Sequence, residues 1–143
     1  MKADWISLFK LVMVAIGGFL GGLLGGWDIM LEVLLTCVVI DLATGIAKAL
    51  MGKSDKAENG GLSSGAIFKG GMRKILIFSV VAVAVVADKI ISPDSTLIRS
   101  GAIAYYIGSE GLSIVENVTL CGLPIPKKLR EILESLKSSK EED

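Results

Sequence analysis

Two carboxylates stand inside long apolar stretches of this 143-residue chain, where charged side chains are rare. Asp41 follows Ile29 by about 12 residues, and Glu110 follows Leu97 by about 13. At a helical rise of about 1.5 Å per residue, both carboxylates lie roughly 18–20 Å from those starting points. We therefore expect them to share one layer of a helical bundle. Carboxylates at such positions serve as proton relays, line water-filled paths or pair with cations.

Further polar side chains accompany each carboxylate at helical spacing. The i, i+3, i+4, i+7 pattern places them on one face of each helix, so the sequence predicts two polar stripes at matching depth. The stripes either line a water-filled path, join subunits, or form an internal network that only holds the bundle. Lys48 and Glu116 each lie about 19 residues from the same starting points, so we expect them to pair near the inner surface. The candidates for assembly or for lining a lumen are Asp41, Thr44, Lys48, Tyr106, Glu110, Ser113, Glu116 and Asn117.

Catalytic chemistry has little support in this sequence. There is no His, and Cys37 and Cys121 are the two cysteines, which excludes His-based triads and the usual zinc clusters. No spacing resembles that of a nucleophile, a phosphate loop or a metal site. The net charge is zero, so nothing indicates a nucleic-acid partner. We therefore expect a protein that is not an enzyme, has no cofactor and forms no disulfide.

The elements that position these residues are long apolar segments. The chain is 52% hydrophobic with a mean hydropathy of +0.65. A helix needs roughly 20 mostly apolar residues to cross a bilayer. Turn signals rich in Gly, Pro, Ser and Asp separate the segments. The sequence predicts a single-domain, all-α integral membrane protein with transmembrane helices at 5–26, 29–51, 75–91 and 97–118, a loop at 52–74 and an amphipathic helix at about 125–137.

The basic residues indicate how these four helices are oriented. With the N-terminus in the cytoplasm, every Lys and Arg except Lys89 and Arg99 falls on the cytoplasmic side, Lys56 and Lys140 included. Because basic residues prefer that side, we expect both termini there. No A-x-A-like site follows the first segment, which disfavours a cleaved signal peptide.

Residues near the membrane surfaces have expected roles of their own. Glu32, Asp88 and Arg99 should extend toward the outer interface. Ser63 and Ser64 should cap a helix that leads into the third membrane segment. The last helix should lie on the inner leaflet or bundle with its copies. The basic residues Lys69, Arg73 and Lys74 should meet anionic lipid headgroups.

Six glycines occupy one half of the first apolar segment, and bulky residues occupy the other half. Small residues four apart let helices approach closely in lipid. The pattern therefore predicts a close helix contact, made either with another copy or a lumen, or with the chain's own helices. These glycines are Gly17, Gly18, Gly21, Gly22, Gly25 and Gly26.

Three stretches resemble a known family, the phage holins grouped with the small toxin-secretion holins of Gram-positive bacteria and their phages. The resemblance covers about residues 29–130. The most specific stretch is similar to the pattern N-E-G-L-S-I-x-E-N followed by G-x-P-x-P, with Ser109 in place of the usual Asn. The three stretches are Asp41-Leu42-Ala43-Thr44-Gly45-Ile46 with Lys48 and Ala49, then Ser63-Ser64 with Lys69-Gly70 and Arg73-Lys74, then Tyr105 to Asn117 followed by Gly122-Leu123-Pro124-Ile125-Pro126-Lys127-Lys128-Leu129.

The resemblance implies a function without an active site. Holins accumulate in the cytoplasmic membrane, assemble with copies of themselves and open lesions that release an endolysin or a toxin. The implied partners are the lipid bilayer and further copies of the chain, and the endolysin or toxin need not make direct contact. The alternative is a small four-span ion channel or proton-coupled transporter that uses Asp41 and Glu110. The lack of any charge between Lys10 and Asp28 counts against the transporter, because small multidrug transporters usually carry their key carboxylate in the first span.

Overall fold

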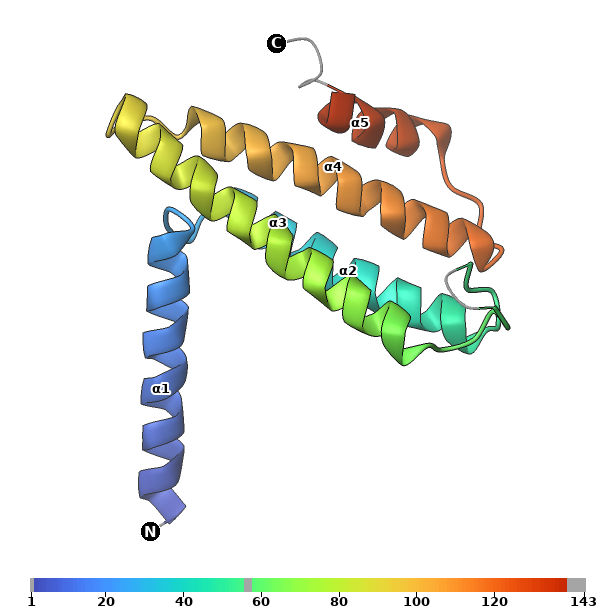
Figure 1. The fold of residues 1–143 in the computed structure, drawn as a ribbon, viewed down its shortest axis with the longest axis horizontal. Helices are drawn as coiled ribbons and strands as arrows, with labels where there is room; N and C mark the ends of the chain where they lie inside the picture. The colour runs from blue at the N-terminus through green and yellow to red at the C-terminus, as the bar shows by residue number, and fades with distance from the viewer. Residues whose placement is uncertain (1, 56–57, 139–143) are drawn as a thin grey trace.

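The computed structural model describes residues 2–55 and 58–138, which form five helices and no strand (Figure 1). This confirms the predicted all-α class. Lys56 and Lys140, which contribute to the predicted charge bias, lie outside the described residues. The helices are α1 (Lys2–Leu23), α2 (Ile29–Leu50), α3 (Ser64–Ile91), α4 (Leu97–Leu120) and α5 (Lys127–Ser138).

Side-chain caps fix where two of these helices begin. The Asp28 carboxylate accepts a hydrogen bond of 2.9 Å from the backbone N–H of Leu31 at the start of α2. The Ser63 hydroxyl accepts one of 3.4 Å from Ala66 at the start of α3, which confirms the predicted cap. Each cap satisfies a backbone donor that the first turn of a helix leaves unpaired.

Two helices differ in extent from the predicted membrane segments. The third long helix begins at Ser64, so the second half of the predicted 52–74 loop is helical. This is the helix that the Ser63-Ser64 cap predicts, and it is continuous with the third membrane segment. The first helix ends at Leu23 and not at residue 26. Gly25 and Gly26 have φ values of +82° and +102°, which belong to a turn and favour glycine.

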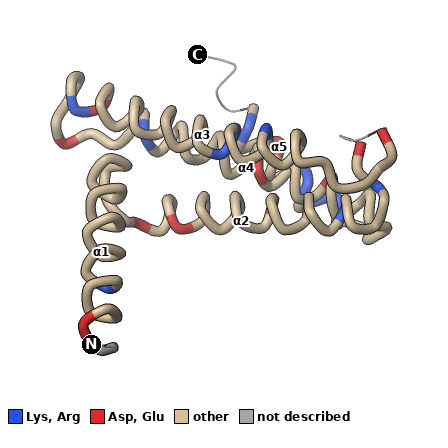
Figure 2. The backbone as a smooth tube through the Cα atoms, turned by 60° about the horizontal axis from the view of Figure 1, so that its bottom comes forward, with Lys and Arg blue, Asp and Glu red and all other residues tan. Residues whose placement is uncertain are grey.

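The central helix of the fold is α4. It packs against α2, α3 and α5, and α5 folds back along it (Figure 1). Helix α1 projects away from one end of this bundle, as the second view also shows (Figure 2). The polar stripe of α4 is therefore enclosed by other helices.

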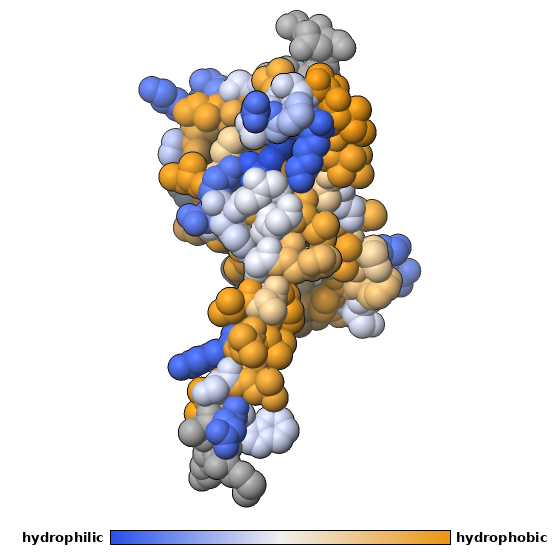
Figure 3. Space-filling model, turned by 90° about the vertical axis from the view of Figure 1, so that its left-hand side faces the viewer, coloured by the Kyte–Doolittle hydropathy of each residue, from blue (hydrophilic) through white to orange (hydrophobic). Residues whose placement is uncertain are grey.

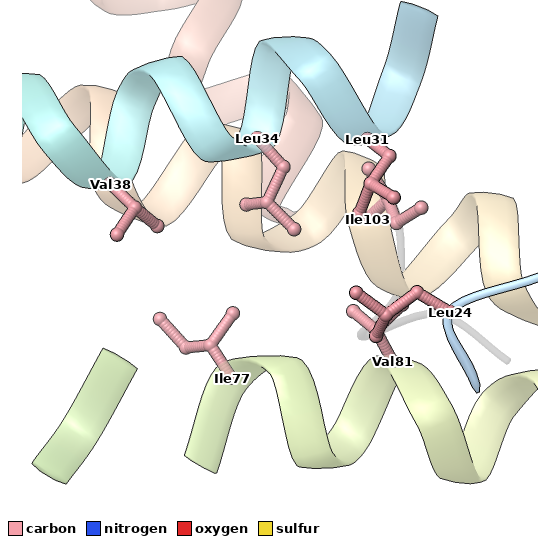
Figure 4. Packing of buried hydrophobic residues seen from close by; sticks show 7 residues of the cluster. All are labelled: Leu24, Leu31, Leu34, Val38, Ile77, Val81 and Ile103. Atoms are coloured by element: carbon pink, nitrogen blue, oxygen red, sulfur yellow. The ribbon is translucent and has the colours of Figure 1, made fainter. Parts of the chain in front are cut away.

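A small apolar core holds α2, α3 and α4 together. Leu31, Leu34 and Val38 follow one face of α2 at helical spacing, and each is at most 5% exposed. They meet apolar side chains from the two neighbouring helices and from the turn after α1. The cluster shown in Figure 4 consists of Leu24, Leu31, Leu34, Val38, Ile77, Val81 and Ile103.

Many large apolar side chains of α1, α2 and α3 are exposed. Hydrophobic side chains cover most of the projecting α1 (Figure 3). Two of the described helices, over Asp4–Leu23 and Ile29–Leu50, are long and apolar enough to cross a membrane. Four spans and cytoplasmic termini stay predictions.

Candidate functional site: a buried charge network

Lys74 of α3 lies at the centre of the bundle between two carboxylates. Its ammonium donates to Asp41 Oδ2 of α2 at 2.5 Å and to Glu110 Oε2 of α4. Lys74 is 7% exposed and Glu110 is 0% exposed. The predicted shared layer of Asp41 and Glu110 is therefore confirmed, because one ammonium contacts both. The expectation that Lys74 meets lipid headgroups is wrong, since the helix that carries it begins earlier and turns it inward.

The network extends from Asp41 toward the end of α4. The Asn117 amide donates to Asp41 Oδ1 at 3.2 Å and to the Thr44 hydroxyl at 3.1 Å. Gly45 lies beside that amide, and a Cβ there would stand 3.7 Å from Asn117 Nδ2, an ordinary van der Waals distance. Four predicted stripe residues, Asp41, Thr44, Glu110 and Asn117, thus belong to one hydrogen-bonded cluster that joins α2, α3 and α4.

The charges of this cluster do not cancel. Two carboxylates face one ammonium, so the ionised cluster of Asp41, Lys74 and Glu110 carries one net negative charge. The second oxygen of Glu110, Oε1, is buried and has no hydrogen-bond partner among the described residues. A buried acceptor without a donor costs free energy. The cluster is therefore joined by strong ion pairs, but one of its buried acceptors, Glu110 Oε1, lacks a hydrogen bond within the described residues.

The remaining candidates lie at the edges of the cluster. Ser113 joins Asp41, Asn117 and Lys74 in lining a cavity of about 110 Å³ between α2, α3 and α4. Tyr106 packs partly buried against the apolar core, with its ring 5.3 Å from that of Tyr105. The positions of Ser113 and Tyr106 are both consistent with the predicted polar stripe of α4.

The predicted pair between Lys48 and Glu116 is not formed within the described part of the chain. Lys48 is 4% exposed and donates to Asp55 Oδ1 at 2.8 Å, while Glu116 is exposed. Counting residues gave both side chains the same depth. It could not show that Glu116 points away from the α2–α4 contact.

A second charged cluster, at the other end of the bundle, was missed by the sequence analysis. The Arg99 guanidinium donates to the Leu24 carbonyl at 2.5 Å, to the Gly26 carbonyl at 3.0 Å and to Asp28 Oδ2 at 2.5 Å. It thereby ties the α1–α2 turn to α4. The hydrogen bond from Arg99 lowers the pKa of the Asp28 carboxyl below its ordinary value of 3.8.

Asp88 completes this second cluster. Its carboxylate accepts hydrogen bonds from the backbone N–H groups of Ile98 at 3.0 Å and Arg99 at 2.8 Å, and so caps the start of α4 from α3. Asp88 and Arg99 are each 3% exposed. The expectation that both extend to the outer interface is therefore wrong. In the sequence, Asp88 and Arg99 lie on either side of one short turn, where an acidic side chain commonly caps the helix that follows.

The glycine face of α1 is not one continuous surface. Gly25 and Gly26 belong to the turn, and the Trp27 indole covers Gly21 while donating to the Gly17 carbonyl at 3.0 Å. At Gly17, Gly18 and Gly22, nothing lies within 4 Å of where a Cβ would stand. Gly25 does meet the chain's own helices, since a Cβ there would stand 2.8 Å from Arg99 Nε of α4 and 3.0 Å from a methyl carbon of Val85 of α3.

Within residues 2–55 and 58–138 no three His, Cys, Asp or Glu side chains are placed to hold a metal ion. Cys37 and Cys121 are both free thiols. The arrangement is suited to holding helices together through charges, and to releasing them when those charges are disturbed.

The amino-acid sequence of this chain is similar to those of several known proteins. Residues 18–138 match the bacteriophage holin family. A probable holin of Bacillus phage phi105 is 33% identical over 112 residues, which cover 78% of this chain and 77% of that protein. An uncharacterised 14.9 kDa protein of Clostridium perfringens is 33% identical, covering 94% of this chain and 97% of its own. An uncharacterised protein of Halalkalibacterium halodurans is 34% identical, covering 92% and 95%. No solved structure matches the chain.

Proposed function

The chain belongs to the bacteriophage holin family, and we propose that it assembles with its own copies in the bacterial cytoplasmic membrane and opens lesions there. An endolysin or a toxin leaves the cytoplasm through these lesions. The family match over residues 18–138 carries the proposal. This family is not one of enzymes, and the apolar helices α1 and α2 suit a membrane protein.

In the proposed topology α1 to α4 each cross the membrane and both termini lie in the cytoplasm. Helices α3 and α4 have 28 and 24 residues, enough to span the roughly 30 Å of a hydrocarbon core. Both carry charges that are unfavourable in lipid. Pairing inside the bundle supports their insertion, because Lys74, Glu110 and Arg99 all face partners of opposite charge.

The buried network suits a protein that stays inactive in the membrane for some time before it forms lesions. While Lys74 joins Asp41 and Glu110, the polar stripes of α2 and α4 face each other, and apolar side chains of α1, α2 and α3 remain exposed to lipid. A lesion that passes a folded enzyme must also present polar surface to water. Rearrangement of the protomers during assembly brings such a surface to the lumen. A switch between two such states needs a bias of only a few kcal/mol.

Induced expression in a bacterium that also produces a cytoplasmic endolysin tests this function. We expect a delay, then a sudden loss of membrane potential together with release of the endolysin. A chain with a frameshift before α2 serves as the control. Slow ion leakage without endolysin release would contradict the proposal and leave a small channel as the better account.

A further inference from the structure

Helix α5 packs on α4 at two glycines near the middle of α4. A Cβ at Gly108 would stand 2.8 Å from the Leu133 carbonyl oxygen and 3.0 Å from the Lys137 nitrogen. A Cβ at Gly111 would stand 2.6 Å from a methyl carbon of Leu133. Both glycines are buried. The two helices therefore meet backbone to backbone, at a separation that side chains larger than glycine would not permit.

The other side of α5 is charged. Only Leu133 and Leu136 are partly buried, and both lie at the α4 contact. The remaining positions are exposed, including Leu129 at 44%, Ile132 at 50% and every charged residue of the helix. These charged residues are Lys127, Lys128, Arg130, Glu131, Glu134 and Lys137.

The depth of the contact conflicts with lipid around α5. Gly108 lies about 18 Å from the end of α4 at Leu120, taking about 1.5 Å per residue. If α4 crosses the membrane, α5 docked at Gly108 lies beside the middle of that span. Charged side chains at such depth require water or a partner of opposite charge. The far side of the bundle has the opposite character, since Val83 of α3 is 67% exposed and Val39 of α2 is 57% exposed.

We propose that α5, docked on α4, forms the water-facing lining of the lesion. This inference rests on the proposed function. Each protomer then presents the apolar faces of α2 and α3 to lipid and the charged face of α5 to the lumen. The competing arrangement has α5 detached and lying on the inner leaflet. That arrangement leaves Gly108 and Gly111 without the close neighbour for which they provide space.

A designed disulfide shows whether α5 is docked in membranes. The pair Gly111→Cys and Leu133→Cys suits this test, because Leu133 Cγ lies 3.4 Å from the Cβ position at Gly111 and the three nearest atoms all belong to the Leu133 side chain. Cys37→Ser and Cys121→Ser remove the native thiols. We expect an intramolecular disulfide in oxidised membranes. The control pair Gly111→Cys and Glu134→Cys should remain unlinked, because Glu134 is exposed and is not among the nearest neighbours of the Gly111 Cβ position. Equal linking of both pairs, or linking of neither, would overturn the proposal.

The linked protein then tests the role of the docked state. We expect oxidised cells that carry the engineered link between positions 111 and 133 to release endolysin on the same schedule as the same cells under reductant. Lysis that stops on oxidation and resumes with reductant would mean that α5 must leave α4, which overturns the lining. If the unlinked parent chain releases no endolysin at all, the proposed function has failed and this inference with it.

Water contact is measured separately in vesicles that contain the purified chain. A single cysteine introduced by Glu134→Cys should react quickly with a charged, membrane-impermeant maleimide. A single cysteine introduced by Val83→Cys on α3 should react at least about tenfold more slowly, because lipid covers it. Equal, slow reaction at both positions would place α5 in lipid or protein and contradict a lining role.

Discussion

At the scale of single residues, Lys74 determines how the polar stripes are arranged. It is the one cation within reach of both Asp41 and Glu110 among the described residues, and it comes from a third helix. Removing one member of a buried ion pair leaves an uncompensated charge, which is far costlier than the pair itself is favourable. The intact cluster therefore adds little to the net stability of the bundle, whereas the loss of one of its members is strongly destabilising.

Replacing Lys74 with Met should destabilise the bundle by about 3–5 kcal/mol, because the buried carboxylate of Glu110 and the partly buried one of Asp41 then lack a cation. Denaturation of the protein in detergent measures the loss, and culture density should show earlier lysis. Lys69→Met is the matched control, since Lys69 is exposed on the same helix and should change nothing. The triple change Asp41→Asn, Lys74→Met, Glu110→Gln should recover part of the stability. Unfolding of Lys74→Met at the parent's denaturant concentration would contradict this account.

The pair of Asp28 and Arg99 should make stability depend on pH in acid. The pKa of Asp28 is lower in the folded protein than its ordinary value of 3.8. Its contribution is therefore complete above pH 3.8 and is lost as the pH falls below that value. We expect the stability difference between the parent and Asp28→Asn to shrink over that acidic range. Denaturation of both proteins at a series of pH values measures it, and a difference that does not change with pH would refute the pairing.

At the scale of helices, some features follow from the sequence and others do not. The shared layer of Asp41 and Glu110 could be predicted because helical rise is constant. Lys74 could not be placed, because a Lys beside Gly and Arg at the edge of an apolar run looks like a loop. Arg99 and Asp28 are 71 residues apart in sequence, and periodicity says nothing about such pairs. The docking of α5 was missed for the same reason, although Gly108 and Gly111 mark the contact.

The two central glycines of α1 should behave differently when enlarged. Gly22 is open, so Gly22→Leu should reduce crosslinked oligomers if another copy packs there. Gly21 lies under the Trp27 indole, so Gly21→Leu should displace Trp27 and disturb the turn to α2. Crosslinking in membranes separates the two effects, with Trp27 fluorescence reporting the second. Unaltered oligomers in Gly22→Leu would refute self-association through this face.

At the scale of the whole molecule, charge is distributed unevenly between the bundle and its surroundings. The chain as a whole is neutral, yet the ionised cluster of Asp41, Lys74 and Glu110 carries one net negative charge in the middle of the bundle. Helix α1 projects without close packing against that bundle (Figure 1). An electric field across the membrane therefore acts on this central charge, as well as on the cluster of Arg99, Asp28 and Asp88 at the end of the bundle.

Loss of membrane potential should trigger the proposed lesions early. A potential of about 100 mV is worth about 2.3 kcal/mol for each charge that crosses it, which is comparable to the bias that a two-state bundle requires. We expect an uncoupler, added before the normal time of lysis, to cause prompt release of the endolysin. Cells without the chain should release nothing under the same uncoupler. The neutral variant Asp41→Asn, Lys74→Met, Glu110→Gln should respond less, because it carries no central charge. If the uncoupler leaves the time of lysis unchanged in the parent, the membrane potential is not the trigger.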